Sequence, residues 1–353
     1  MRRIGRLIAI LLVVVMTMIA CGKKTIEIQE VDKLLKEAET RIDYSSIENL
    51  NLEPGTKISV VLKESKNGYW KAVTLGVQKA VDDFNEVLGY KGNDKIQVVF
   101  DAPSTGKDVE QQINIIDTVI AENPDILCLA AIDMASCIAQ VEAAKENGIP
   151  IIFIDSAVES DDIDIICATD NYKAGREAAK KMAEGIEYQG EIAVLAHISI
   201  TETSKERLSG FQDEIKENYL DIKIVEVSFD EPEEFNMDLV GLVSEVMEEH
   251  PSLDGYFGTN ESMTTAILEA NKNNEEGLIV VGFDSGEVLQ DAVRDGSLYG
   301  FISQNPYAMG YIAVVAGARA TLNKANEKFI STGYIWVEQN NIEEEDIQQY
   351  LYK

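Results

Sequence analysis

Short apolar runs recur along the chain from Lys57 onward, and they alternate with segments whose apolar residues lie three or four positions apart. In chain order the runs are KISVVL, KIQVVF, DILCLAA, PIIFID, EIAVLA, IKIVEV, DGYFGT, LIVVGF and LYGFIS. Continuous apolar runs are typical of strands buried on both faces, whereas the spacing of Val73, Val77 and Val81 is that of a helix. The alternation predicts an α/β fold with parallel sheets covered by helices on both faces.

The predicted strands are too numerous for one sheet of ordinary size, so we expect two doubly wound domains. No stretch rich in Gly and Ser separates them. Short ordered segments would then cross between the domains and act as a hinge.

The first twenty residues have the pattern of an export signal. Three arginines precede an apolar run from Leu7 to Ile19, which is too short for a comfortable membrane span. The sequence MIACG at the end of this run resembles the lipobox of bacterial lipoproteins, although Met18 stands where Leu is usual. We predict a lipoprotein signal peptide over residues 1–20 and a lipid on Cys21. The alternative is an ordinary signal peptide that is cut near Ala20.

Residues 21–55 are polar and charged and end in Pro54-Gly55, which predicts a tether between the lipid anchor and the folded body. The chain has 353 residues and a formal net charge of −31, which becomes −34 once residues 1–20 and their three arginines are removed. Such an acidic surface repels phosphate backbones and has no basic cluster to offset this. Nucleic acid is therefore excluded as a partner.

The cysteines and histidines give no sign of metal or redox chemistry. Cys128, Cys137 and Cys167 are scattered through apolar segments, so we expect buried free thiols. Only His197 and His250 are present, and there is no HExxH motif. We predict neither a metal site nor a cofactor.

Polar side chains follow many of the predicted strands. They are Asn67, Asp155, Asn260, Asp284 and Gln304. Ligands of open α/β sheets bind outside the carboxyl ends of the strands, so these side chains are candidates for one shared cleft. Capping of the next helix is the alternative role for Asp284 and Asn260. Amides, carboxylates and Arg207, without a paired nucleophile and base, suit the recognition of hydroxyl groups better than catalysis.

Residues from Lys57 to about Gln339 resemble the type 1 periplasmic sugar-binding proteins, and in particular the ribose-binding group. The resemblance is carried by NGYWKAV, GIPIIFIDS, ATDNYKAG, SKERLSGF, GTNESMTTAI, VVGFDSG and ISQNP, which occur in the family's order. It implies two doubly wound parallel-sheet lobes joined by a hinge. By this resemblance the first lobe takes residues 56–168 and 305–331, and the second takes 169–304 and 332–353.

The resemblance also implies the residues that hold the ligand. They are Asn67, Tyr69, Trp70, Asp155, Arg207, Asn260, Asp284 and Gln304. An aromatic residue of the second lobe is expected as well; we prefer Phe229, and Phe235 is the alternative. Ribose binders carry Arg directly after the aspartate, where this chain has Ser156. Loss of a bidentate donor makes ribose itself a doubtful ligand.

We therefore predict a lipid-anchored, extracytoplasmic solute-binding protein that takes up a monosaccharide or similar polyol for an ABC importer by closing two lobes around it. It would be a monomer and would contact a permease. The alternatives are a sugar-sensing receptor for a membrane kinase or chemoreceptor and, more remotely, a glycan hydrolase.

Overall fold

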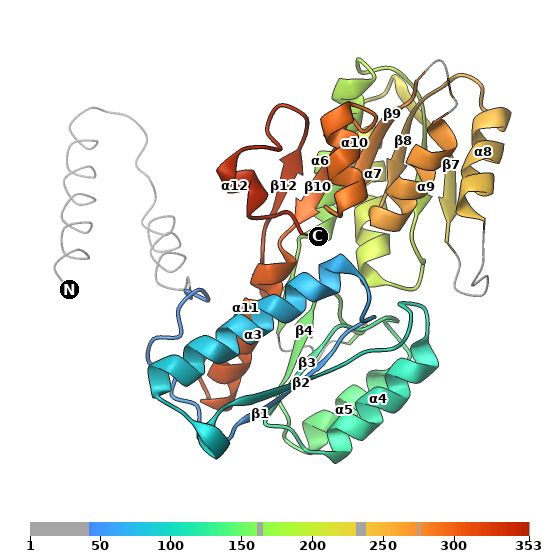
Figure 1. The fold of residues 1–353 in the computed structure, drawn as a ribbon. Coiled ribbons are helices and arrows are strands. Elements are labelled where there is room, and N and C mark those ends of the chain that lie inside the picture. Colours follow the sequence, from blue (N-terminus) through green and yellow to red (C-terminus); the bar gives the residue numbers. More distant parts are fainter. Residues whose placement is uncertain (1–41, 161–164, 231–237, 273, 275–276, 353) are drawn as a thin grey trace, which may run out of the picture. The chain divides into compact units, whose positions relative to one another are not determined.

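The computed structural model describes residues 42–160, 165–230, 238–272, 274 and 277–352, and the described residues from 44 to 352 form the folded body. Two separate six-stranded sheets organise these residues (Figure 1). The predicted signal peptide and Cys21 lie outside the described residues.

The first sheet has the strand order β11-β5-β4-β3-β1-β2. Its strands are β1 (Lys57–Val61), β2 (Gln97–Asp101), β3 (Ile126–Leu129), β4 (Ile151–Ile154), β5 (Ile166–Ala168) and β11 (Phe329–Ser331). All pairings within it are parallel. We call the part of the chain built on this sheet the first lobe.

The second sheet has the strand order β12-β10-β9-β8-β6-β7. Its strands are β6 (Gly190–Ala196), β7 (Ile222–Phe229), β8 (Leu253–Gly258), β9 (Ile279–Phe283), β10 (Gly300–Gln304) and β12 (Tyr334–Val337). Of these described strands, only β12 runs antiparallel to its neighbour, β10. We call this part the second lobe. Apart from its edge strand, it repeats the order and direction of the first.

Helices cover both faces of each sheet. In the first lobe, α3 (Gly68–Leu88) and α11 (Pro306–Thr321) pack on one face and α4 (Val109–Ala121) and α5 (Ile138–Glu146) on the other (Figure 1). In the second lobe the helices are α6 (Asn171–Gly185), α7 (Glu202–Asn218), α8 (Leu239–Glu249), α9 (Glu261–Asn271) and α10 (Glu287–Asp295). The short helices η1 (Gly92–Asp94) and α12 (Glu345–Gln348) complete the described set. The layers bury the aliphatic strand residues, as the apolar runs predict.

Close helix pairs recur in the two lobes because glycines lie where they cross. A Cβ atom on Gly76 of α3 would lie 1.9 Å from the carbonyl oxygen of Tyr307 in α11. In the second lobe, a Cβ on Gly175 of α6 would lie 2.2 Å from the carbonyl oxygen of Arg207 in α7. The backbones can approach this closely only without side chains at these positions. The α6–α7 contact fixes the backbone of Arg207.

The α/β fold with two doubly wound lobes is confirmed, and each of the predicted apolar runs forms a strand. The pattern missed β5, β11 and β12, which are only three or four residues long. Cys128, Cys137 and Cys167 are buried free thiols, as predicted. Among the described residues, no helix is both long enough and apolar enough to cross a membrane.

Part of the predicted tether belongs to the folded first lobe. Tyr44, Leu50 and Leu52 are buried, at 6%, 3% and 1% exposure. The hydroxyl of Tyr44 accepts a hydrogen bond of 2.8 Å from the backbone N–H of Glu327, and Tyr90 donates one of 2.7 Å to the carbonyl oxygen of Leu52. The polar composition of residues 21–55 concealed these three apolar anchors.

Candidate functional site

A cavity of about 370 Å³ lies at the carboxyl ends of the strands and is lined by side chains of both lobes. The strand order is β2-β1-β3 in the first sheet and β7-β6-β8 in the second, so in each sheet the chain moves to one side of its first strand and then to the other. Ligands of such sheets usually bind at this topological switch point. Of the predicted residues, the lining includes Asn67, Tyr69, Trp70, Asp155, Arg207, Asn260, Asp284 and Gln304.

Tyr69 and Trp70 lie in the first turn of α3, which begins at Gly68 directly after the N-cap Asn67. Both rings are 6% exposed and line the cavity, and they meet edge to face with 5.0 Å between their centroids. Tyr69 is also anchored by its hydroxyl, which donates to Asp155 at 2.8 Å. Their burial against one another gives the cavity a rigid aromatic corner.

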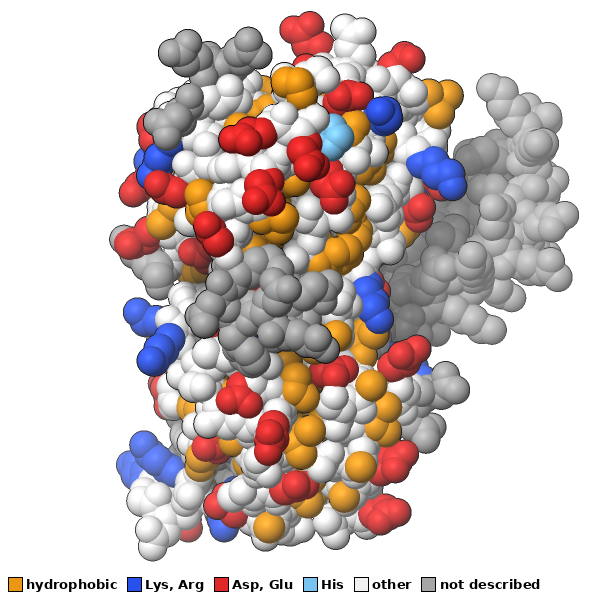
Figure 2. All heavy atoms as spheres, turned by 90° about the vertical axis from the view of Figure 1, so that its right-hand side faces the viewer, with side chains coloured by type: hydrophobic (Ala, Val, Ile, Leu, Met, Phe, Trp, Pro, Cys, Tyr) orange, Lys and Arg blue, Asp and Glu red, His pale blue; other side chains and the backbone are white. Residues whose placement is uncertain are grey.

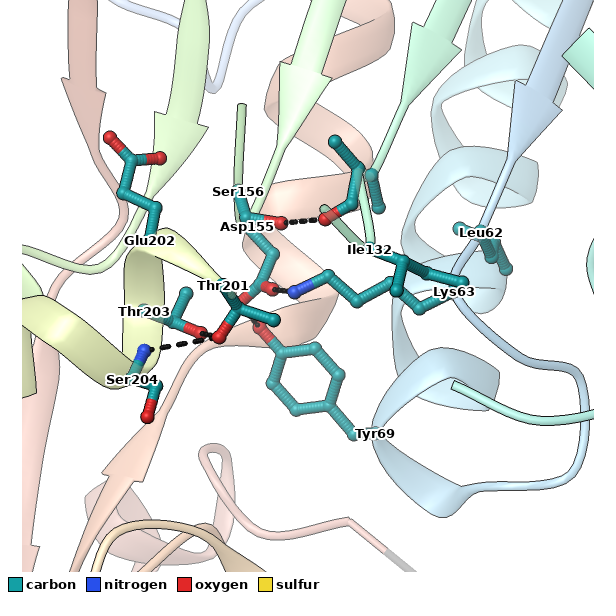
Figure 3. Close-up of polar contacts among 12 residues, drawn as sticks. Leu62, Lys63, Tyr69, Ile132, Asp155, Ser156, Thr201, Glu202, Thr203 and Ser204 are labelled. Atoms are coloured by element: carbon teal, nitrogen blue, oxygen red, sulfur yellow. Dashed lines mark hydrogen bonds and ion pairs between the residues drawn. The ribbon is translucent and has the colours of Figure 1, made fainter. Parts of the chain in front are cut away.

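Asp155 follows β4 and is held by two donors of the first lobe (Figure 3). Lys63 Nζ lies 2.8 Å from its Oδ2 atom, and the Tyr69 hydroxyl lies 2.8 Å from its Oδ1 atom. Burial disfavours the carboxylate, but the charges of Lys63 and Arg207 and the two hydrogen bonds outweigh it and lower the pKa of Asp155. This wall of the cavity is an ion pair.

Asp284 follows β9 and has a different set of partners. Its Oδ1 accepts from Gln304 Nε2 at 2.7 Å, and its Oδ2 accepts from the backbone N–H of Glu261 at 3.2 Å. No ion pair to Asp284 occurs among the residues that the structure describes. Burial therefore raises the pKa of Asp284, although the charge of Arg207 and these hydrogen bonds oppose the rise.

Arg207 of α7 is 3% exposed and is fixed on three sides. Its Nε donates to Asn171 Oδ1 at 2.8 Å, and one Nη donates to the carbonyl oxygen of Thr259 at 2.8 Å. Its guanidinium carbon lies 3.7 Å from the centroid of the Phe283 ring. A guanidinium has five N–H donors, so further donors remain for a ligand in the cavity.

His197 follows β6 and lines the cavity beside two threonine hydroxyls. Its ring nitrogens lie 2.8 Å from Thr259 Oγ1 and 3.2 Å from Thr203 Oγ1. Burial, with the charges of Arg207 and Lys63, lowers the pKa of His197 well below its usual value. The ring is therefore neutral at physiological pH and acts as a hydrogen-bonding group of the wall.

Asn67 and Asn260 are both helix caps and cavity residues. Asn67 Oδ1 accepts from the Tyr69 N–H at 2.7 Å, and Asn260 Oδ1 accepts from the Met263 N–H at 2.9 Å. The two roles considered for Asn260 are thus compatible, since capping uses only the amide oxygen. Asp284 does not cap the helix that follows it, because Gly286 is the N-cap of α10.

The expected aromatic residue of the second lobe is not found in the described cavity wall. Phe229 is the last residue of β7, is partly buried and is not among the residues lining the cavity, whereas the next residue, Asp230, is. Phe235 lies outside the described residues. Ser156 is 1% exposed, and its hydroxyl donates to the carbonyl oxygen of Ala131 at 2.6 Å, so it too is absent from the described wall.

Several charged residues of the site escaped the sequence analysis. Lys63 stands two residues after the end of β1 and pairs with Asp155. Lys107 of the first lobe pairs with Asp230 of the second at 2.6 Å. Glu202 of α7 also bridges the lobes and accepts from the Ala157 N–H at 3.1 Å. Lys63 and Asp230 follow the ends of strands, so the rule applied to the other site residues could have indicated them. Their ion-pair partners could not be found in this way, because these pairs form only in the tertiary structure.

The site offers hydrogen-bond donors and acceptors next to an aromatic corner, which suits an uncharged ligand rich in hydroxyl groups. Lys63 and Lys107 are neutralised by Asp155 and Asp230, so the described wall has no unpaired lysine to attract an anion. On the face drawn in Figure 2, Asp and Glu side chains are scattered over the surface, and the described Lys and Arg side chains form no continuous patch. No cluster of metal-ligating side chains occurs in the described ranges.

Comparison with known proteins places this geometry in a family. The periplasmic binding protein domain matches residues 58–325. The ribose import binding protein RbsB of Bacillus subtilis is 25% identical over 224 residues, which make up 64% of this chain and 72% of that protein. The xylitol-binding protein of Mycolicibacterium smegmatis is 26% identical over 220 residues, 61% of each chain.

Among solved structures, an ABC transporter solute-binding protein from Agrobacterium vitis with bound D-fucose has a TM-score of 0.76 and is 27% identical, with 84% of this chain and 100% of that chain covered. These relatives are solute-binding proteins and not enzymes, in agreement with the prediction that the chain is not an enzyme. The match over residues 58–325 shows that the chain belongs to the periplasmic binding protein family, alongside the solute-binding proteins of sugar ABC transporters to which it is similar.

Proposed function

We propose that this protein captures a neutral monosaccharide or similar polyol and delivers it to an ABC importer. The observation that carries the proposal is the cavity of about 370 Å³, in which an aromatic corner faces amides, carboxylates and Arg207. Relatives named for ribose, xylitol and D-apiose support a small polyhydroxylated ligand.

Binding would proceed by closure of the two lobes on the ligand. The first lobe supplies Asn67, Tyr69, Trp70 and Asp155, and the second supplies Arg207, Asn260, Asp284 and Gln304. Because both lobes contribute, the ligand stabilises the closed form, which a permease can then recognise. We divide the lobes at residues 168–169, 304–305 and 331–332, since the strands of the two sheets change over at these crossings.

We further propose that ribose is not the preferred ligand. Ser156 occupies the position of the arginine of ribose binders and is turned away from the cavity. Lys63 provides a cation beside Asp155 instead, but an ammonium group cannot make the bidentate contact of a guanidinium. A sugar or polyol with a different arrangement of oxygens should therefore bind more tightly than ribose.

The protein would act at the outer face of the membrane, held there by a lipid on Cys21. Cys21→Ala should leave the precursor unprocessed or release the protein from the membrane fraction. If the variant is processed and bound to membranes like the unmodified protein, the lipid anchor on Cys21 is refuted. The proposed binding function is not affected by that outcome.

The binding function is tested with the purified chain and a panel of D-ribose, D-fucose, D-arabinose, D-apiose and xylitol. A ligand that binds only the folded state raises the melting temperature by mass action, and calorimetry then gives its Kd. We expect at least one compound to bind, and to be recovered chemically unchanged. Failure of the whole panel, or turnover of the bound compound, would contradict the proposal.

A further inference from the structure

Gln304 and Thr169 meet at the hinge between the lobes. The Thr169 hydroxyl donates to Gln304 Oε1 at 2.8 Å, and both residues are buried, at 1% and 2% exposure. Gln304 lines the cavity, whereas Thr169 is not among the residues that line it. The same amide donates from Nε2 to Asp284 Oδ1 at 2.7 Å. One side chain therefore joins the hinge to the cavity wall.

The two residues occupy equivalent positions in the two lobes. The Asp155 N–H donates to the carbonyl oxygen of Cys167 in β5, and the Asp284 N–H donates to that of Ile302 in β10. Thr169 lies two residues beyond Cys167, and Gln304 lies two residues beyond Ile302. The repeated fold thus brings one position of each lobe face to face, but only the glutamine is long enough to reach the cavity.

Asp284 determines which way the Gln304 amide points, and the Thr169 hydroxyl holds the amide in that orientation by donating to its oxygen. With Nε2 toward Asp284 and Oε1 toward Thr169, both hydrogen bonds form. The reversed amide would set its oxygen against an ionised carboxylate, which can only accept. In the observed orientation the second N–H of Nε2 is available to a ligand.

We infer that Thr169 is a positioning residue that fixes the Gln304 amide as a hydrogen-bond donor to the ligand. The inference rests on the proposed function and adds that the amide side chains of the site act as hydrogen-bond donors to the ligand. Asn67 and Asn260 have the same polarity, because their Oδ1 atoms accept from the N–H groups of Tyr69 and Met263. All three amide side chains of the described wall therefore offer N–H groups, and the ligand must present acceptor oxygens to each of them.

The test compares two substitutions that differ in one hydroxyl group. Thr169→Val keeps the shape and removes the donor to Gln304, and Thr169→Ser keeps the donor. Each is titrated by calorimetry with D-fucose, D-arabinose, D-ribose and xylitol. For every compound that binds the unmodified protein, we expect Thr169→Val to raise the Kd about fivefold or more and Thr169→Ser to stay within about twofold. Equal Kd values for Thr169→Val and the unmodified protein would overturn the inference.

A second measurement needs no ligand. In a ¹⁵N-labelled sample, the Gln304 side-chain amide is assigned by its loss in Gln304→Met. In the unmodified protein and in Thr169→Ser we expect slow hydrogen exchange of the N–H that is bonded to Asp284. Thr169→Val should accelerate this exchange. If the valine variant does not fold, Thr169→Ala is measured in its place. Unchanged exchange in the variant without the hydroxyl would overturn the inference. If none of the compounds binds the unmodified protein, the proposed function fails while the exchange result still decides the role of Thr169.

Discussion

Asp155 and Asp284 are the same residue in two copies of one architecture, yet their chemistry differs. Each directly follows a strand, β4 or β9, and each has a left-handed backbone, with φ of 66° and 75°. Asp155 accepts hydrogen bonds from an ammonium group and a phenol hydroxyl, whereas Asp284 accepts them from a side-chain amide and a backbone N–H. The fold therefore fixes where the carboxylate stands, and its neighbours from other strands decide its charge.

The opposite pKa shifts express this difference. The pKa of Asp155 is lowered because the charges and hydrogen bonds of its partners outweigh burial, and the pKa of Asp284 is raised because burial outweighs its partners. One wall of the cavity thus has a carboxylate that releases its proton more readily than usual, and the other has one that takes up a proton more readily. Four changes would break or sharpen this comparison.

The largest effect is expected from removal of the cation of the first lobe. Lys63→Met leaves Asp155 as a buried charge without its ion-pair partner, which should lower the free energy of unfolding by about 3 kcal/mol. Urea denaturation measures the change. Lys71→Met, on the exposed side of α3, is the matched control and should change little. The double variant Lys63→Met with Asp155→Asn should recover most of the loss; equal stability of Lys63→Met and the control would refute the ion pair.

Ligand affinity should depend on both walls. Alanine in place of Asp155, Arg207 or Asp284 leaves hydroxyl partners unsatisfied in a dry site, so each variant should lose at least about tenfold in affinity by calorimetry. Phe229→Leu is the control, because Phe229 does not line the cavity, and it should keep its Kd within about twofold. Unchanged affinity in two of the three alanine variants would contradict the assignment of the binding site.

The pH dependence of stability should have opposite signs at the two aspartates. With a lowered folded pKa, Asp155 stabilises the fold above its unfolded pKa of about 3.9, and this is lost as the pH falls through the folded value. With a raised folded pKa, Asp284 contributes most below its unfolded pKa and loses this as the pH rises through the folded value.

Asn substitutions isolate these contributions. The stability advantage of the unmodified protein over Asp284→Asn should grow as the pH falls toward about 4, and its advantage over Asp155→Asn should shrink only below about pH 4. Chemical denaturation across this range gives both differences. Parallel curves for the two variants would show that the pKa values of Asp155 and Asp284 are not shifted in opposite directions.

The smallest effect is spectroscopic. Trp70 lines the cavity, whereas Trp336 of β12 donates from its ring N–H to Glu338 at 2.6 Å and does not line it. A ligand that closes the site should change fluorescence mainly through Trp70. Trp70→Phe should therefore lose most of the ligand-induced signal while calorimetry still detects binding, and Trp336→Phe should keep it. The reverse pattern would place Trp70 outside the responsive part of the site.

The sequence predicts best what local patterns decide. Apolar runs specify the longer strands, and the rule that ligands bind at the carboxyl ends of strands brought Asn67, Asp155 and Asp284 to attention, all of which line the cavity. The strands β5, β11 and β12 were missed because they are short and only partly buried, unlike the fully buried four-residue strands β3 and β4, and they owe their conformation to a neighbouring strand.

Ion pairs between residues distant in the sequence could not be predicted from the hydrophobic pattern either. Lys63 and Asp155 are 92 positions apart, and Lys107 and Asp230 are 123 apart, so nothing local links them. Phe229 was preferred because the family resemblance implies an aromatic residue from the second lobe; it ends β7 and does not line the described cavity, whereas Asp230 does. In an extended strand successive side chains alternate between faces, so neighbouring residues reach different surroundings.

The positions of β11 and β12 have a consequence for the order in which the molecule is assembled. Each is an edge strand of a sheet whose other strands come from residues 57–168 or 190–304, and α11 must also return to cover the first sheet. A nascent chain that has not reached residue 306 therefore lacks α11 on one face of the first sheet as well as an edge strand of both sheets. Neither half can therefore complete its native contacts before residues 306–337 have been made, and the slow, long-range steps of folding follow for both halves together.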